Sequence, residues 1–293
     1  DGEISEMNAE TLSEIASKNK DIIKTLPSFY NIQLTDFVSG DLIYISDDVK
    51  KSSSRDVSSC RQIDFDSACK LIDEIASFSE NAVISLSYFG EPFAHEKLLE
   101  IVKKILSYKG LSVFIETDGF LVTEEIAAAL KTVSDNAVER TNGYEKIMFA
   151  VSLDAFTVQT YEKIHSLGEA EFKKALDEVS VLAKFFPNSV YPEFIRMNEN
   201  EEELESFYRF WNEKSNPSNG NLIIQKYNSF CGELPDRKPA DLSPLERNVC
   251  WHLRRDISIL LNGDVSFCHA RPFEIVGNVF DEGLEEIWKK TDG

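Results

Sequence analysis

Alternation of β-like and helical segments constrains the fold of this chain most. Six short runs rich in β-branched and aromatic residues are predicted strands, at 30–34, 82–88, 112–117, 147–153, 190–195 and 221–225. Five amphipathic segments lie between them, at 65–78, 97–108, 123–133, 169–186 and 201–212. Strands separated by helices form βαβ units and a parallel sheet. The sequence therefore predicts an α/β fold, a partial (β/α)6 TIM-like barrel of parallel strands.

The two ends of the chain depart from this alternation. An amphipathic run closed by Pro27 predicts an N-terminal helix, and prolines after about position 228 mark a linker. Two β-rich runs then flank Asn262-Gly263, a strong hairpin signal because a type I′ turn needs positive φ at both residues. We expect an N-terminal helix at 1–27, the barrel at 28–227 and a small C-terminal domain, with a hairpin and a helix at 284–290, at 228–293. Two polar runs, 46–59 and 135–145, are predicted loops.

Charge and cysteine content limit the partners. The chain carries 51 acidic and 31 basic residues, a net charge of −20, which excludes nucleic acid and anionic membranes because their phosphates require Lys and Arg. No stretch approaches the ~18 apolar residues that a membrane helix needs. Five cysteines scattered over 293 residues do not suggest a disulfide scaffold, so we expect a cytoplasmic protein.

Three motifs follow the predicted strands in order. Tyr88-Phe-Gly-Glu-Pro92, Thr117-Asp-Gly119 and Val151-Ser-Leu-Asp-Ala155 resemble motifs of radical S-adenosylmethionine (radical SAM) enzymes, and 31–45 has the shape of the strand and loop that opens their barrel. The resemblance extends over almost the whole chain. It implies S-adenosylmethionine binding, with Glu91 holding the methionine amino group. Asp118 and Asp154 lie at the same mouth, where parallel barrels gather their active sites.

Each of these three carboxylates has a simpler explanation. Glu91 precedes Pro92 and could cap the following helix or face water. Asp118 and Asp154 end strands, where an Asp side chain commonly stabilises a turn through hydrogen bonds to the backbone. The sequence leaves the ligand-binding and the turn-stabilising interpretations open.

The opening loop lacks the cysteines that the resemblance requires. In radical SAM enzymes a Thr is followed by Cys-x3-Cys-x2-Cys, which holds a [4Fe–4S] cluster. Counted from Thr35, these positions are Val38, Leu42 and Ile45, whose hydrocarbon side chains offer iron no lone pair. No cysteine precedes Cys60, so no shift of register restores the motif. We therefore expect no cofactor at the barrel's cluster site.

The tail resembles a SPASM domain, the cysteine-rich module of peptide-modifying radical enzymes. Cys250, Gly263 and Cys268 have its spacing, and Gly277-Asn278 and Leu284-Glu-Glu-Ile-Trp288 match its later motifs. The family's further Cys-x2-Cys cluster is absent. The combination is most similar to the group called spiro-SPASM proteins.

A metal site in the tail is one of two interpretations of its cysteines. Cys250 and Cys268, with Cys231 as a third ligand and His252 and His269 adjacent, could hold zinc or a residual iron–sulfur cluster, which needs four N or S ligands in tetrahedral reach. Alternatively, Cys250 and Cys268 are thiols packed under the hairpin.

Three functions follow from these observations. The first is a radical SAM-derived pseudo-enzyme without catalytic residues, its barrel mouth plugged or repurposed to bind a peptide, a protein partner or a small molecule. The second is an active radical SAM/SPASM enzyme that modifies a peptide or protein, with a cluster assembled unconventionally. The third is a structural or metal-scaffold module of a longer polypeptide, suggested by the start without Met and the abrupt end.

Overall fold

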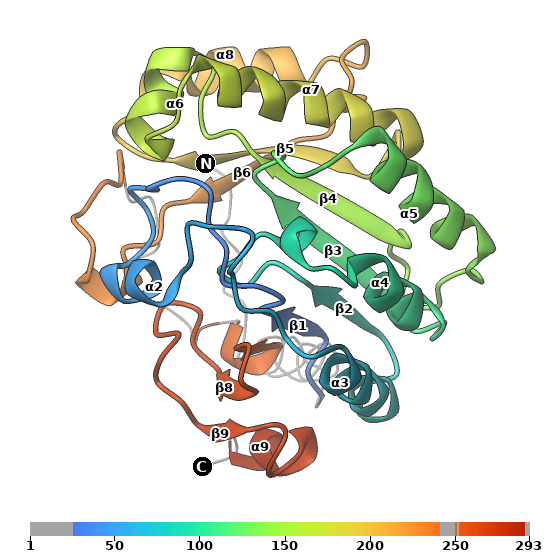
Figure 1. The fold of residues 1–293 in the computed structure, drawn as a ribbon. Coiled ribbons are helices and arrows are strands. Elements are labelled where there is room, and N and C mark those ends of the chain that lie inside the picture. Colours follow the sequence, from blue (N-terminus) through green and yellow to red (C-terminus); the bar gives the residue numbers. More distant parts are fainter. Residues whose placement is uncertain (1–25, 241–249, 251, 291–293) are drawn as a thin grey trace, which may run out of the picture.

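The computed structural model describes residues 26–240, 250 and 252–290. Within these residues one sheet runs through the molecule in the order β6-β5-β4-β3-β2-β1-β7-β8-β9 (Figure 1). Its first six strands are parallel and confirm the predicted runs: β1 Phe29–Ile32, β2 Ala82–Ser85, β3 Leu111–Thr117, β4 Ile147–Ser152, β5 Val190–Arg196 and β6 Ile223–Lys226. The predicted parallel α/β fold is confirmed. The predicted helix at 1–27 lies almost entirely outside the described residues.

Helices cover the outer face of this sheet (Figure 1). They are α3 Phe65–Phe78, α4 Leu98–Leu106, α5 Glu124–Asn136, α6 Val158–His165, α7 Glu169–Phe185 and α8 Leu204–Trp211. Shorter helices are α2 Asp47–Ser52, η1 Pro92–Ala94, η2 Glu201–Glu203, η3 Phe230–Gly232, η4 His252–Arg254 and α9 Leu284–Lys289. Among the described residues, none of the helices has the length and apolar character needed to cross a bilayer.

The prediction of a loop at 46–59 is wrong for its first half, which forms helix α2. Ser46 caps α2 by accepting a hydrogen bond from the Val49 amide, and Val49 is the buried residue of this single-turn helix. One buried apolar residue gives no helical periodicity, which explains why the sequence pattern did not indicate α2. Helix α6 was also missed, because its eight residues bury only Tyr161, Ile164 and His165.

The strand register separates an apolar face from a mixed face that carries acidic residues. Residues paired across neighbouring strands point to the same side, so Glu116, Ala150 and Tyr191 share one face, and Ser152 and Glu193 share it too. The opposite face carries the fully buried core under the helices: Val113, Ile115, Phe149, Val151 and Phe194. The inner face of the partial barrel is thus mixed: Glu116 and Glu193 lie among apolar residues such as Phe114 and Met148.

The C-terminal hairpin continues the barrel sheet. Strand β7, Asp256–Ile259, pairs in parallel with β1, and β8, Asp264–Ser266, and β9, Gly277–Asn278, follow in antiparallel order. The predicted hairpin is confirmed, but the type I′ turn is wrong. The Gly263 amide donates to the Leu260 carbonyl at 2.9 Å, the Leu260 amide donates to the Asp264 carbonyl at 2.9 Å, and Gly263 alone takes a φ of +87°. This is a three-residue loop with a bulge at Gly263, so Asn262 keeps an ordinary φ.

Candidate functional site at the carboxyl ends of the strands

The 38–45 loop, where the family carries its cysteines, lies against the end of α6. A Cβ atom at Gly40 would come within 2.5 Å of the His165 carbonyl oxygen, so the two backbones touch. The Ile43 amide donates to the Ile164 carbonyl at 3.1 Å, and the Ser166 hydroxyl donates to the Asp41 carbonyl at 3.1 Å. The close approach and these hydrogen bonds fix the loop on α6.

The other side of the 38–45 loop is held equally firmly. The Val38 amide donates to the Ser54 carbonyl at 2.9 Å, and the Arg55 guanidinium donates to the carbonyls of Val38 and Gly40. Val38 is buried, whereas Leu42 and Ile45 are half-buried. The residues present therefore do not fit a [4Fe–4S] cluster, since the three positions offer hydrocarbon and the loop backbone is bonded to protein.

Next to Ile43, Tyr44 faces the interior from the same loop. Both side chains pack against a small apolar cluster of Ile164, Met197 and Tyr227. The Tyr44 ring meets the His165 ring edge-on at 6.1 Å, and burial followed by the charge of Asp154 raises the pKa of Tyr44 well above its usual value. The loop thus supplies a hydrophobic and aromatic cover where its relatives place cysteine ligands.

Glu91 is 4% exposed and both of its carboxylate oxygens accept hydrogen bonds from protein groups. Oε1 accepts from the Phe93 amide at 3.0 Å, and Oε2 accepts from the Thr117 hydroxyl at 2.9 Å and the Asp118 amide at 3.0 Å. Glu91 therefore caps η1 and ties it to the end of β3. Burial, followed by the nearby charge of Asp118, raises the pKa of Glu91 well above its usual value.

Asp118 connects the end of β3 to the 38–45 loop. Its Oδ2 accepts from the Ser39 hydroxyl, and its Oδ1 accepts from the Phe120 amide at 3.1 Å, closing a turn. The turn-stabilising role expected of a strand-end Asp is therefore present. The structure also places Asp118 beside Glu91, as the strand order predicts.

Asp154 lies at the end of β4 with no exposed surface and a φ of +53°. Its Oδ1 accepts from the Ile195 amide at 2.6 Å, which joins the ends of β4 and β5. Its Oδ2 lies 3.2 Å from Nε2 of His165, a residue of α6 that is 1% exposed. Asp154 and His165 thus form a buried pair directly beneath Tyr44.

Two further acids at this mouth were missed by sequence reasoning. Glu116 on β3 and Glu193 on β5 both face the inner side of the barrel. Burial and the charge of Asp154 raise the pKa of Glu116 to about 7, and burial with the charges of Glu116 and Asp154 raises the pKa of Glu193 well above its usual value. A charged residue inside an otherwise apolar strand run was the signal that could have indicated them.

Phe89 stands where the family has the first Gly of its Gly-Gly-Glu-Pro motif. Its φ of +60° is strained for a bulky residue. Its ring stacks on His269 at 5.6 Å and lies 4.2 Å from the Tyr88 ring, and Phe230 lies at 6.2 Å. This aromatic cluster joins the barrel mouth to the tail.

The predicted metal ligands remain separate free thiols. Cys231 and Cys250 are exposed, and Cys268 is half-buried. Within the described residues no group of three His, Cys, Asp or Glu side chains lies within reach of one metal ion. A metal site at Cys231, Cys250 and Cys268 therefore stays a prediction, without geometric support from the described part of the chain.

Comparisons with known proteins agree with this fold. The SPASM family, described as an iron–sulfur cluster-binding domain, matches residues 250–292. Streptococcus suis SuiB bound to precursor peptide SuiA superposes with a TM-score of 0.64 at 13% identity, covering 98% of this chain and 72% of that chain. The tail of this chain matches the SPASM family, and the chain as a whole has the fold of radical SAM/SPASM enzymes.

Other relatives extend the comparison. AdoMet-bound anSMEcpe superposes with a TM-score of 0.60 at 14% identity, covering 90% of this chain and 80% of that chain. BtrN in complex with AdoMet and 2-DOIA gives a TM-score of 0.51 at 14% identity, covering 90% and 82%. An uncharacterized protein of Treponema pallidum (strain Nichols) is 39% identical over 293 residues, which span 97% of this chain and 78% of that protein.

Proposed function

We propose that this chain is a radical SAM-derived, non-catalytic pseudo-enzyme that binds a peptide or a peptide segment of a protein partner at its barrel. One observation carries the proposal. The 38–45 loop offers Val38, Leu42 and Ile45 at the cluster positions and is bonded through its backbone to α6 and Arg55. Without the cluster there is no source for the radical chemistry of an active relative, the second hypothesis.

The solved relatives support a peptide as the ligand. SuiB is bound to precursor peptide SuiA, and anSMEcpe was solved with AdoMet and the Cp18Cys peptide, at a TM-score of 0.56, 13% identity and coverage of 90% of this chain and 80% of that chain. The inner face of this barrel combines acidic, small and apolar side chains, which suits the main-chain and side-chain groups of a peptide.

Retention of S-adenosylmethionine would rest on Glu91, Asp118 and Asp154. Both oxygens of Glu91 already accept hydrogen bonds from Phe93, Thr117 and Asp118, so a ligand amino group would have to share or displace these donors. These residues fit the cofactor poorly, and we propose no step through it. Boundaries at about 28–227 for the barrel and 228–293 for the tail, and a cytoplasmic location suited to free thiols, belong to the same proposal.

Anaerobic reconstitution with iron and sulfide tests the proposal. The wild-type protein is compared with a Cys231→Ser/Cys250→Ser/Cys268→Ser variant, because iron that disappears in this variant belongs to the tail. We expect no iron in the variant and no 5′-deoxyadenosine from S-adenosylmethionine with either protein. A reducible cluster in the variant, with cleavage of S-adenosylmethionine, would show an active barrel and overturn the proposal.

A further inference from the structure

A half-buried glutamate, Glu116, and a fully buried one, Glu193, lie on either side of small side chains on the inner face of the barrel. Glu116 pairs in register with Ala150, and Glu193 pairs with Ser152, so β4 separates β3 from β5 by small residues only at this level. Large side chains on β4 would fill the space between the two carboxylates. Ala150 and Ser152 instead form the floor between them, and Tyr44 lies close by, since burial and the charges of Asp154, Glu116 and Glu193 raise its pKa.

Among the acids at this floor, only Asp154 has a basic partner within the described residues, His165. In the described part of the chain, no Lys or Arg forms an ion pair with Glu116, Asp154 or Glu193. Oε1 of Glu193 accepts from the Gln225 amide, but Oε2 is buried and accepts no hydrogen bond there. Burying an unpaired carboxylate costs several kcal/mol, so this arrangement favours protonation or an incoming cation.

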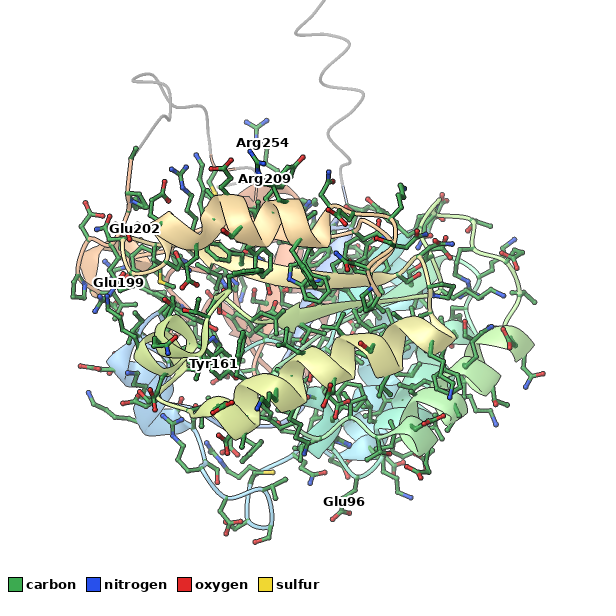
Figure 2. The ribbon with its side chains drawn as sticks, turned by 90° about the horizontal axis from the view of Figure 1, so that it is seen from above. Glu96, Tyr161, Glu199, Glu202, Arg209 and Arg254 are labelled. Atoms are coloured by element: carbon green, nitrogen blue, oxygen red, sulfur yellow. The ribbon has the colours of Figure 1, made fainter. Side chains whose placement is uncertain are left out.

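Further buried polar atoms near this site also lack a hydrogen-bond partner within the described residues. Nε2 of His165 and Oδ2 of Asp154 lie 3.2 Å apart, yet among the described residues neither completes a hydrogen bond. The His165 ring stacks on Tyr161 at 4.2 Å, and the buried Tyr161 hydroxyl is likewise without a partner there. Figure 2 shows Tyr161 within the body of the molecule, whereas Arg209 and Arg254 lie at its periphery. Unpartnered buried polar groups beside a set of carboxylates indicate a site for a ligand that brings hydrogen-bond donors.

We propose that Glu116, Asp154 and Glu193 bind a cationic side chain, the ammonium of a lysine or the guanidinium of an arginine, of the peptide bound at the barrel. This inference rests on the proposed function and names the chemistry of its ligand. Lys and Arg side chains carry several donors and a full positive charge, which match the buried oxygens Oε2 of Glu193 and Oδ2 of Asp154.

An organic cation fits the geometry better than a metal ion. No three His, Cys, Asp or Glu groups of the described residues converge on one metal position. The β6 side of the sheet gives a peptide its approach, because β6 is the end strand of the sheet as described and Gln225, exposed on β6, contacts Glu193 directly. An extended peptide along β6 would present every second side chain to the inner face.

Fluorescence anisotropy with labelled alanine-based peptides tests this assignment. The peptides carry one central lysine, arginine or norleucine, and free agmatine serves as a competitor that has the cation without the peptide. We expect the lysine and arginine peptides to bind at least about tenfold more tightly than the norleucine peptide, with agmatine a weak competitor. Glu193→Gln is expected to remove most of this preference. Glu139→Gln, which changes net charge equally at a 92% exposed side chain, is expected to leave it intact.

A second variant tests the floor without changing charge. Ala150→Leu places a larger side chain between the two glutamates and is expected to weaken binding of the lysine peptide at least about tenfold. Circular dichroism checks that this variant and Glu193→Gln fold. Equal binding of the norleucine and lysine peptides would overturn this inference while leaving a peptide-binding pseudo-enzyme standing. Agmatine binding as tightly as the peptides would make a small amine the ligand and overturn the peptide assignment. A preference unchanged in Glu193→Gln would place the site elsewhere.

Discussion

Gly90 lies directly against Thr35: a Cβ atom at position 90 would come within 1.9 Å of the Thr35 carbonyl oxygen. The Thr35 hydroxyl donates to the carbonyl of Glu91 at 2.8 Å, and the Glu91 amide donates to the Phe37 carbonyl at 2.9 Å. The segments that follow β1 and β2 are therefore packed backbone to backbone. The glycine of the Tyr88-Phe-Gly-Glu-Pro92 motif holds the barrel mouth together in this protein.

Gly90→Ala is expected to destabilise the protein by about 2–4 kcal/mol, because the added methyl group must displace main chain rather than a flexible side chain. Urea unfolding followed by circular dichroism measures this change. Gly168→Ala is the matched control, since a Cβ there meets only the Glu171 carboxylate at 3.4 Å, and its cost should stay under about 1 kcal/mol. Equal costs for the two substitutions would contradict the packing of Gly90 on Thr35.

Substitutions in the hairpin turn of the tail distinguish the observed three-residue loop from a type I′ turn. In the observed three-residue loop only Gly263 requires positive φ, and a Cβ on it would meet the Phe280 ring at 2.3 Å. Gly263→Ala should therefore destabilise the protein by about 1–3 kcal/mol. Asn262→Ala should cost less than about 1 kcal/mol, since Asn262 keeps an ordinary φ and only its side-chain hydrogen bonds with Asp264 are lost. Comparable losses for both variants in thermal unfolding would favour the type I′ turn instead.

The strands were predictable because each is a short run rich in β-branched and aromatic residues, and a helical segment separates most of these runs from the next. Helix α3 is predicted at its observed bounds because Phe65, Ala68, Cys69, Ile72 and Ile75 repeat at helical spacing. Helices α2 and α6 were not, because they are short and bury few apolar side chains. Hydrophobic periodicity indicates a helix only where the helix is long enough for the pattern to repeat.

The site was predictable only in part, for a related reason. Glu91, Asp118 and Asp154 belong to motifs that resemble those of radical SAM enzymes, and these motifs follow strands that end at one edge of the sheet. The contact of Gly40 with His165, and the proximity of Glu116 to Glu193, join residues far apart in the chain. Such contacts depend on the register of the sheet and the path of the 38–45 loop, which no local pattern specifies. The aliphatic residues of that loop indicate that the cluster cysteines are missing. The structure shows that the loop instead packs on α6 and Arg55.

The buried acids predict an unusual pH dependence of stability. Glu116 has a pKa of about 7 in the folded protein against 4.5 for the free side chain, so the folded state holds its proton more tightly. This stabilisation is complete below about pH 4.5 and is lost as the pH rises through about 7. We therefore expect the free energy of unfolding to fall on the order of 2–3 kcal/mol from this group between about pH 5 and about pH 8.

Glu116→Gln tests the assignment, because a neutral amide binds no proton in either state and should flatten this slope. Urea unfolding at several pH values gives the slope for each protein. Glu139→Gln should leave it unchanged, since that carboxylate is almost fully exposed. A slope that Glu116→Gln does not alter would mean that Glu116 is ionised in the folded barrel, with a cation that compensates it.

Thiol reactivity distinguishes free cysteines in the tail from metal ligands. Cys231 and Cys250 are exposed, whereas Cys60, Cys69 and Cys268 are partly covered, and burial raises the pKa of the Cys60 and Cys69 thiols. A disulfide reagent such as DTNB attacks accessible thiolates, so we expect two of the five thiols to react fast in the native protein. Cys231→Ser and Cys250→Ser should each remove one fast thiol, and treatment with EDTA should change nothing. Because metal ligation protects a thiolate from attack, fast thiols that increase in number after EDTA would show that these cysteines hold a metal ion.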